Sequence, residues 1–380
     1  MLEILNLKPE AFGLDISDLS LKIIKLKKKR DSLTLASFGE TEIKPGIIEG
    51  GEIKNEDALS KIIKEAIPKI KGAKIGTKYV VSSLPEEKAF LQVIQLPTMK
   101  EEELKKAVLF EAENYIPLPI DEVYLDFQIV QPVVNHLDHI DILIAALPRK
   151  TVDPYLNLFK KAGLQPKAFE IESQAISRAI VKNELSPFPI LLIDFGATRT
   201  GFIIFSGYSL RFTASISVSS QKFTEAISKT LKIDLAEAEK LKIKYGAEEK
   251  LRAKFKNEKS ETEKEKSDIF EALIPSFTDL AKQVEKYINY YQSHAQHEHL
   301  ASNDKKISKI LLCGGGANLK GLAEFLTAEL KIPTEMGNPW INILSKDLRE
   351  VPELSYEKSL GYTTALGLAL RGIKESKLLP

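Results

Sequence analysis

Hydrophobic residues recur with two different periods along the first part of the chain, and these periods predict a mixed α/β fold. Residues 32–38 alternate apolar and polar side chains, and residues 11–14 and 21–26 are mostly apolar, which is typical of β-strands. Residues 55–70 instead space their apolar side chains three and four positions apart, as one face of a helix does. The apolar run at 79–84 predicts a buried strand. We therefore expect a sheet covered by a helix.

The pattern changes between residues 85 and 165, where it predicts a compact α+β subdomain inserted into the first domain. Residues 98–101 have the form of a capping box, which predicts a helix start, and Pro117 predicts the end of that helix near residue 116. A strand precedes this helix, and two strands and a second helix follow it. We expect these other elements at residues 90–96, 123–130, 140–147 and 154–162.

The opening pattern of three strands returns in residues 190–215, after a proline-containing linker. The long interval between the two copies indicates a duplicated domain rather than a solenoid repeat. A helical stripe over residues 280–291 predicts core packing, and the charged stretch 252–268 predicts either an exposed helix or a mobile loop. We assign residues 1–84, completed by about 166–186 and 345–380, to the first domain, and 187–344 to the second, with a subdomain at about 218–307.

Composition and charge narrow the class of protein. The chain has 380 residues, 43% of them hydrophobic and 28% charged, and its formal net charge is +1. This balance is typical of a soluble globular protein and excludes the basic field that drives non-specific nucleic-acid binding. A single cysteine excludes an intramolecular disulfide and is typical of a reducing compartment. Because neither a signal-peptide pattern nor a membrane-spanning apolar run is visible, we expect a cytoplasmic protein.

Three strands end in turns whose residues suit a bound nucleotide. The turns at 12–17 and 193–198 each follow an apolar strand and carry an aspartate, and the strand at 310–313 runs into three glycines. Backbone amides in such turns can cradle phosphate oxygens, and an aspartate at a strand end can hold Mg²⁺ through water. Glycines let the backbone approach a ribose or an adenine. The order of these three turns along the chain predicts a nucleotide bound between two related domains. The residues concerned are Asp15, Asp194, Gly314, Gly315 and Gly316.

Other candidate chemistry is weaker. The Gly-x-x-x-x-Gly-Lys-Ser/Thr phosphate loop does not occur in the sequence. His294, His297 and His299 lie near an expected helix end without acidic or cysteine partners, which favours a solvated helix end over a metal site. Cys313 follows three apolar residues, so we interpret it as a core thiol rather than a nucleophile. The basic cluster 27–30 is interpreted as a solvated hairpin turn, with contact to an acidic membrane surface as the alternative.

The two aspartate turns and the Gly-Gly-Gly-Ala-Asn-Leu run resemble the phosphate and adenosine motifs of the actin-like ATPase superfamily. The inserted α+β subdomain narrows this resemblance to the branch that contains FtsA and the type IV pilus assembly family PilM. The stretches that resemble the PilM family lie at residues 96–104, 111–119, 162–166, 238–242 and 360–371. The resemblance implies an α/β protein with a duplicated actin-like, RNase H-type two-domain fold and an SHS2-like inserted subdomain.

The resemblance also implies which residues would hold ATP and Mg²⁺. Asp15 and Asp194 would bind the metal through water, and Glu172 would position a water molecule. Glu239 and Lys242, one helical turn apart, would flank the adenine. The other expected cofactor-binding residues are Gly13, Ser17, Lys22, Gly196, Thr198, Thr200, Gly314, Gly315, Gly316 and Asn318.

Four residues depart from the family pattern at the phosphate turns. Ser17 stands where the family usually has glycine, Asp18 follows it, and Ser219 and Ser220 replace a glycine pair. An acidic side chain beside a triphosphate repels it, and added Cβ atoms take up space near the phosphates. We therefore predict nucleotide binding weaker than is usual for the family and, at most, a weak ATPase activity.

For function, the resemblance implies a cytoplasmic ATP-binding adaptor at the periphery of the inner membrane. It would dock the short cytoplasmic tail of a PilN-like membrane protein in a groove that involves the insert. Contacts with pilus motor ATPases and self-association are further expectations, nucleic acid is not expected as a partner, and the membrane would be reached only through partners. Two alternatives stay open: an FtsA-like cell-division scaffold, and a phosphotransferase with Glu170 or Glu172 as general base.

Overall fold

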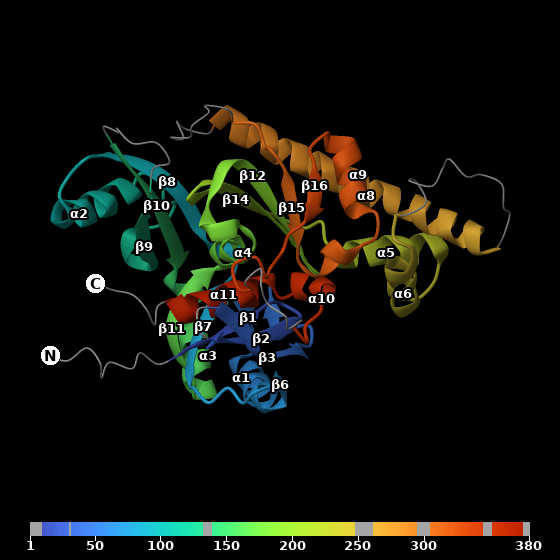
Figure 1. Ribbon diagram of the computed structural model, residues 1–380, viewed down its shortest axis with the longest axis horizontal. Coiled ribbons are helices and arrows are strands. Elements are labelled where there is room, and N and C mark those ends of the chain that lie inside the picture. Colours follow the sequence, from blue (N-terminus) through green and yellow to red (C-terminus); the bar gives the residue numbers. More distant parts are fainter. Residues whose placement is uncertain are drawn as a thin grey trace.

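The computed structural model describes residues 10–29, 32–131, 139–247, 261–294, 305–344 and 352–374. Three β-sheets of three or more strands organise these residues. In the view of Figure 1, a six-stranded sheet lies below a five-stranded one, and the three-stranded sheet lies at the upper left. The protein therefore consists of two large sheet-centred bodies with a smaller one beside them.

The six-stranded sheet has helices on both faces. Its order is β11 (Gln165–Ile171), β7 (Tyr79–Leu84), β1 (Phe12–Ile16), β2 (Ser20–Lys29), β3 (Ser32–Glu42) and β6 (Lys71–Gly72). Successive residues of β1 face opposite sides. Phe12 and Leu14 share a core with α1 (Glu56–Ala66) and α3 (Arg149–Ala162), whereas Gly13 faces α11 (Thr363–Lys374).

The five-stranded sheet repeats the connectivity of the first. Its order is β14 (Ser209–Ile216), β13 (Thr200–Gly207), β12 (Ser186–Phe195), β15 (Ile310–Cys313) and β16 (Thr334–Met336). β12 pairs antiparallel with β13 and parallel with β15, just as β1 pairs antiparallel with β2 and parallel with β7. This repeat is the duplication expected from the sequence. The helices that share its larger core are α5 (Ser220–Leu231), α6 (Leu235–Tyr245), α8 (Glu261–His294) and α9 (Leu322–Leu330).

Helix α4 (Glu172–Ile180) connects the two bodies. On one side it packs against α11 so closely that a Cβ at Gly367 would lie 1.9 Å from the carbonyl oxygen of Ala175. On the other side Ile176 and Ile180 belong to the core cluster of the five-stranded sheet. A helix that is packed on both sides transmits a shift of one body to the other.

The inserted sheet has the order β8 (Phe90–Pro97), β10 (His139–Pro148) and β9 (Val123–Ile129), and α2 (Glu101–Ala112) covers one face of it. The capping-box prediction is wrong, because Lys100 occupies the N-cap position and no side chain caps the helix there. The helix also ends earlier than expected. The N–H groups of Tyr115 and Ile116 both donate to the Ala112 carbonyl, so the chain tightens into turns before Pro117.

The second helix that the sequence assigns to the insert belongs to the core of the first domain instead. In α3, Tyr155, Leu158 and Phe159 are fully buried together with Leu59 and Ile63 of α1. The apolar spacing correctly predicted a helix, but spacing alone does not say which sheet the apolar face will cover. The insert is therefore smaller than the expected 85–165. No helix among the described residues is long and apolar enough to span a bilayer.

Candidate functional site

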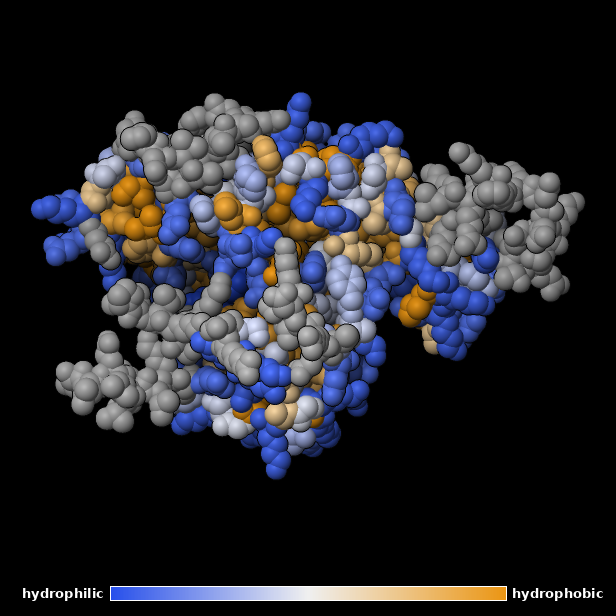
Figure 2. Space-filling model, viewed as in Figure 1, coloured by the Kyte–Doolittle hydropathy of each residue, from blue (hydrophilic) through white to orange (hydrophobic). Residues whose placement is uncertain are grey.

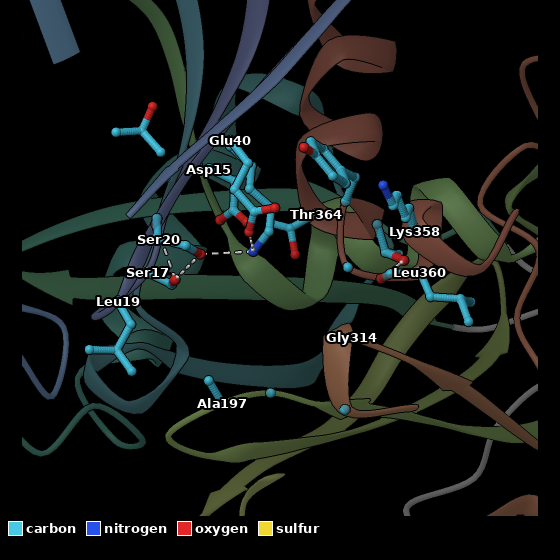
Figure 3. Close-up of a pocket in the computed structure, with 18 of the residues that line it drawn as sticks. Asp15, Ser17, Leu19, Ser20, Glu40, Ala197, Gly314, Lys358, Leu360 and Thr364 are labelled. Carbon is cyan, nitrogen blue, oxygen red and sulfur yellow. Dashed lines mark hydrogen bonds and ion pairs between the residues drawn. The ribbon is translucent and has the colours of Figure 1, made fainter. Parts of the chain in front are cut away.

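A cavity of about 760 Å³ lies between the two large bodies and is lined by residues of both. This volume is in the range of small-molecule sites. Figure 3 shows that its walls come from the β1–β2 hairpin on one side and from the chain after β15 and around α10 (Tyr356–Leu360) on the other. The expected site residues that line it are Asp15, Ser17, Lys22, Glu172, Asp194, Gly196, Thr198, Glu239, Gly314, Gly315, Gly316 and Asn318.

Asp15 lies near the end of β1 and is almost completely buried, with 7% of its surface exposed. The Ser83 hydroxyl donates to its Oδ1 at 2.9 Å. Burial raises the pKa of Asp15 to about 6, because a charged carboxylate is poorly solvated there. Lys22 lowers this pKa and Glu172 raises it. The positive charge near Asp15 therefore does not offset the effect of burial on its carboxylate.

Asp194 occupies the matching place near the end of β12. Burial raises its pKa to about 7, and the nearby carboxylates of Glu172 and Asp15 act in the same direction. Two carboxyl groups that face one cavity and repel each other suit a shared cation. Among the described residues, no group of three or more His, Cys, Asp or Glu side chains could hold a metal ion directly.

The β1–β2 hairpin fixes the first phosphate turn. The Ser17 N–H donates to the Ser20 carbonyl at 2.9 Å, and the two serine hydroxyls lie 2.9 Å apart. Lys22 Nζ donates to Ser20 Oγ at 2.8 Å and lies 3.7 Å from Glu40 Oε1. Ser17 therefore closes the hairpin with its hydroxyl, and Lys22 places an ammonium group at the cavity.

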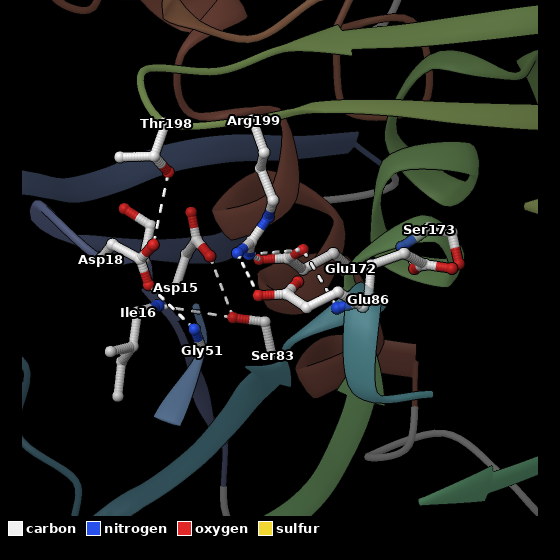
Figure 4. Close-up of polar contacts among 12 residues, drawn as sticks. Asp15, Ile16, Asp18, Gly51, Ser83, Glu86, Glu172, Ser173, Thr198 and Arg199 are labelled. Atoms are coloured by element: carbon white, nitrogen blue, oxygen red, sulfur yellow. Dashed lines mark hydrogen bonds and ion pairs between the residues drawn. The ribbon is translucent and has the colours of Figure 1, made fainter. Parts of the chain in front are cut away.

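Asp18 does not line the cavity. Its Oδ1 accepts the Gly51 N–H at 3.0 Å, and its Oδ2 accepts the Thr198 hydroxyl at 3.4 Å (Figure 4). Two donors that are distant in sequence therefore hold this carboxylate away from the space that the predicted phosphates would occupy. Ser219 is likewise engaged, since its hydroxyl accepts the Lys222 N–H as the N-cap of α5.

The glycine turn after β15 brings the backbone close to Asp194. Gly314 has a φ of +86°, and a Cβ there would lie 2.4 Å from Asp194 Oδ1. A Cβ at Gly315 would meet no atom within 4 Å, so this residue opens onto the cavity. Asn318 Nδ2 donates to the Glu357 carbonyl at 2.8 Å and ties the turn to α10. The turn is thus open at Gly315 and tightly packed at Gly314.

Three of the expected site residues do not reach the cavity. Gly13 instead permits the approach of α11, because a Cβ there would lie 2.4 Å from the Ala365 carbonyl oxygen. Thr200 is buried, and its hydroxyl donates to the Val218 carbonyl at 2.7 Å. Lys242 is also buried, and it donates to Ser220 Oγ at 2.8 Å, which holds α6 against α5. All three serve the packing around the site.

Glu172 lines the cavity but is already paired. Arg199, in the turn between β12 and β13, donates from Nη2 to both Glu172 oxygens at 2.9 and 3.1 Å. Arg199 was missed by the sequence analysis, although its place next to Thr198 in a predicted phosphate turn was a usable signal. Further lining residues outside the prediction are Ser20, Glu40, Ser220, Lys358 and Thr364.

The remaining candidates behave as ordinary core and surface groups. Cys313 is fully buried, and burial raises the pKa of its thiol well above the usual value. Its predicted place in the core is therefore confirmed. His294 lies on the exposed end of α8 and stacks on Tyr290 with ring centroids 4.2 Å apart. His297 and His299 lie outside the described residues.

A second hollow, of about 660 Å³, separates the insert from the rest of the protein. One wall is the face of β9 and β10 that α2 does not cover, and the other comes from β11, α3, α4 and the β13–β14 turn. We call it the insert groove. Its apolar lining includes Leu143, Leu147, Leu156, Phe169, Ile171 and Leu210. Apolar residues are also exposed on the outside of the insert, where Phe110 is 74% exposed; Figure 2 shows hydrophobic colour at this end of the molecule.

Strand β9 gives the insert groove an open edge. The Val130 N–H donates to the Asp141 carbonyl at 2.9 Å, so the backbone groups of Leu125, Phe127 and Ile129 point away from β10. Within the described part of the chain no strand pairs with that edge. Residues 124–128 all line the groove, odd and even positions alike. The groove therefore offers a free strand edge beside an apolar wall.

The duplicated bodies, the aspartate at the end of the first strand of each and the glycine turn beside a shared cavity define an actin-like protein. Solved structures agree with this fold. MreB5 of Spiroplasma citri bound to AMPPNP is 14% identical, with a TM-score of 0.54 over 97% of this chain and 98% of that one. The ethanolamine utilization protein EutJ of Carboxydothermus hydrogenoformans is 14% identical, with a TM-score of 0.54 over 96% and 90%.

The family model of the type IV pilus assembly protein PilM matches residues 13–373, and the chain belongs to that family. A solved PilM–PilN type IV pilus biogenesis complex is 28% identical, with a TM-score of 0.75 over 96% of this chain and 99% of that one. The protein is therefore an actin-like protein of type IV pilus assembly, and the family and fold class expected from the sequence are confirmed.

Proposed function

We propose that this protein is an ATP-binding adaptor of the pilus assembly platform at the inner membrane. It docks the cytoplasmic N-terminal tail of a PilN-like membrane protein in the insert groove. The observation that carries the proposal is the insert groove itself, where an unpaired strand edge runs beside an apolar wall. The chain's likeness to the protein of a PilM–PilN complex supports the same partner.

An extended peptide suits this groove because it can add to the edge of β9. The backbone groups of Leu125, Phe127 and Ile129 would pair with the peptide main chain, and alternate side chains of the peptide would contact the apolar wall. Helix α3 and the β13–β14 turn line the groove opposite β9, so the space beside that edge suits a narrow segment. A short tail therefore fits better than a domain surface.

For the nucleotide, the residues around the cavity fit ATP with Mg²⁺. Asp15 and Asp194 would hold the metal through water, Lys22 and Thr198 would meet phosphate oxygens, and the backbone at Gly315 would lie against the nucleoside. The metal would supply positive charge between two carboxyl groups whose pKa values are raised. Bound nucleotide would hold the two bodies together around the cavity.

Neither residue named as general base for the phosphotransferase alternative is free to act as one. Glu170 lies in the insert groove, not in the cavity, and Arg178 and Arg371 bind it at 2.5 Å. Glu172 is bound by Arg199. A carboxylate held by arginine is a poor proton acceptor, because the cation stabilises its charged form. The adaptor role, with at most weak ATP hydrolysis, is therefore favoured.

Isothermal titration with a synthetic peptide of the partner's cytoplasmic tail tests the docking proposal. We expect saturable binding to the full chain, and a loss of at least tenfold in affinity for Leu156→Glu, which buries a charge in the groove wall. Leu109→Glu is the matched control. Both leucines lie on helices and are similarly exposed, Leu109 at 41% and Leu156 at 39%, but Leu109 lies outside the groove. Absence of binding, or equal losses in both variants, overturns the groove as the docking site.

A further inference from the structure

Arg199 joins the nucleotide cavity to the root of the insert. It belongs to the second body, yet both of its partners belong to the first. Nη1 donates to Glu87 Oε1 at 2.6 Å, and Nη2 donates to both oxygens of Glu172 (Figure 4). The Arg199 side chain is only 19% exposed. Burial disfavours its charge, but these carboxylates hold the pKa of its guanidinium above the usual value.

The two partners of Arg199 lie where the insert begins. Glu86 and Glu87 form a short 3-10 turn, η3 (Glu86–Lys88), between β7 and β8. Glu172 begins α4. Glu86 Oε2 accepts the Ser173 N–H at 3.1 Å, and Glu172 Oε2 accepts the Glu86 N–H at 3.4 Å. These reciprocal bonds cap α4 with a residue from the insert root, since no side chain of its own segment does so.

This junction is incompletely bonded. Glu86 Oε1 and Ser173 Oγ are buried without a hydrogen bond of good geometry, although the side chains of Ser173 and Thr213 lie close enough to lower the pKa of Glu86. Burial raises the pKa values of Glu86 and Glu87, with Arg199 opposing the shift at Glu87. Two carboxylates, those of Glu87 and Glu172, therefore share one guanidinium in a partly dry place, with the buried Glu86 beside them. Such an arrangement depends strongly on that cation, because removing it leaves like charges close together.

The junction also touches both functional hollows. Arg199 and Glu172 line the cavity. Leu84 and Ile171, which directly precede the junction segments, line the insert groove. Arg199 follows Thr198 in the second phosphate turn, and arginine forms strong paired hydrogen bonds with phosphate. A triphosphate in the cavity would therefore compete with Glu172 and Glu87 for the same guanidinium.

We propose that Arg199 binds the terminal phosphate of a nucleoside triphosphate, and that it releases Glu172 and Glu87 when it does so. The released carboxylates repel each other, the reciprocal caps of Glu86 and Ser173 weaken, and the root of the insert loosens. Nucleotide occupancy thereby alters the wall of the insert groove. This inference rests on the proposed function, because it requires a nucleotide in the cavity and makes the insert groove depend on whether that nucleotide is bound.

Hydrogen–deuterium exchange of the full chain tests the proposal. We expect amides of residues 84–90 and 171–176 to exchange severalfold faster with saturating Mg·AMPPNP than with Mg²⁺ alone, and to remain slow with Mg·ADP. A ligand that simply fills a cleft protects the segments around it, so faster exchange is a distinctive result. Binding is measured on the same samples by titration calorimetry. Binding of Mg·AMPPNP with slower or unchanged exchange overturns this inference alone, and absence of binding overturns the proposed function as well.

Variants separate a phosphate contact from a merely structural role. In Arg199→Gln, the junction amides should exchange fast without nucleotide, and nucleotide should not change their exchange rate further. The affinity of this variant for AMPPNP should fall about tenfold and that for ADP much less, because only the triphosphate would lose a charge-assisted contact. Arg211→Gln is the control, since Arg211 also joins the second body to the insert, through Asp141 at 3.2 Å, but does not line the cavity. It should keep the wild-type response to AMPPNP. Equal losses for AMPPNP and ADP in Arg199→Gln would overturn the terminal-phosphate contact.

Discussion

Thr198 and Asp18 join the two bodies of the protein beside the cavity, with the threonine hydroxyl donating to the aspartate Oδ2 at 3.4 Å. Asp18 belongs to the turn between β1 and β2, and Thr198 to the matching turn between β12 and β13. Equivalent turns of the duplicated domains therefore contact each other directly. Because Asp18 also accepts the Gly51 N–H, its carboxylate is fixed at the edge of the nucleotide site.

Removing the Asp18 charge should strengthen nucleotide binding. In Asp18→Ser, the loss of one nearby carboxylate should remove about 1 kcal/mol of repulsion toward a triphosphate, so the Kd for Mg·ATP should fall about fivefold. Competition titration measures this change. Asp126→Ser, which removes an exposed carboxylate of the insert, should leave the Kd unchanged. If Asp18→Ser binds Mg·ATP no better than the wild type, the electrostatic reason for weak binding is wrong.

The raised pKa of Asp15 predicts how stability depends on pH. The folded protein holds the Asp15 proton up to about pH 6, whereas the unfolded chain loses it near pH 4. The folded state therefore binds more protons in this interval, and its stability should fall as pH rises from about 4 to about 6.

Asp15→Asn should remove the part of this dependence that Asp15 contributes, while Asp194, whose pKa is raised to about 7, still contributes its own part. At pH 8, without nucleotide or Mg²⁺, we expect its free energy of unfolding to exceed that of the wild type by about 2 kcal/mol, and at pH 4 the two should converge. Urea denaturation across this pH range provides the measurement, and Asp279→Asn, on the exposed face of α8, is the control. A wild type that remains more stable than Asp15→Asn at pH 8 would contradict the prediction.

Two glycines of the predicted site should respond differently to the same substitution. Gly13→Ala places a methyl group against main-chain atoms of α11, 2.4 and 2.6 Å away, and should destabilise the fold by about 2 to 3 kcal/mol. Gly315→Ala meets no atom within 4 Å, so it should fold normally and weaken nucleotide binding instead. Thermal unfolding and nucleotide titration of both variants test this. The reverse result would place Gly13, not Gly315, at the ligand.

The buried carboxylate of Glu170 should be important for stability. Burial opposes its ionisation, but Arg178 and Arg371 hold its pKa below the usual range. Glu170→Gln leaves both arginines without their shared partner and should cost about 3 kcal/mol in urea denaturation. Glu335→Gln removes one member of an exposed pair with Lys309 and should cost less than about 0.5 kcal/mol. Similar small losses in both variants would show that the network at Glu170 contributes little.

The sequence predicted the order of strands and the two aspartate turns well, because these depend on local apolar spacing and on residues next to each other in the chain. It could not separate Gly13 from Gly315. Gly13 lies inside β1 and Gly315 follows β15, and Gly13 is required by the close approach of α11, which comes from the other end of the sequence. The same limit applies to α3, because the sequence pattern predicted its apolar face but not the sheet against which that face packs.

Lys242 and Arg199 show which roles in the site could not be predicted from the sequence. A resemblance placed Lys242 at the adenine, yet its ammonium group turns inward to Ser220 and Thr224. Arg199 stood in a predicted turn without a role, because its partners Glu87 and Glu172 come from a different body. Contacts between residues far apart in sequence decide such roles, and no local pattern contains them.

The unpaired edge of β9 can promote aggregation as well as the binding of a partner. An unpaired strand edge can join the edge of any other exposed strand, including that of a second copy, and so promote aggregation. Here the Asp126 carboxylate accepts the outward N–H of Phe127 at 2.9 Å and adds a negative charge beside it. An incoming strand must displace this acceptor and tolerate its charge. A strand from a second copy would therefore have to replace this bond and accept the added negative charge, which disfavours edge-to-edge pairing of two copies.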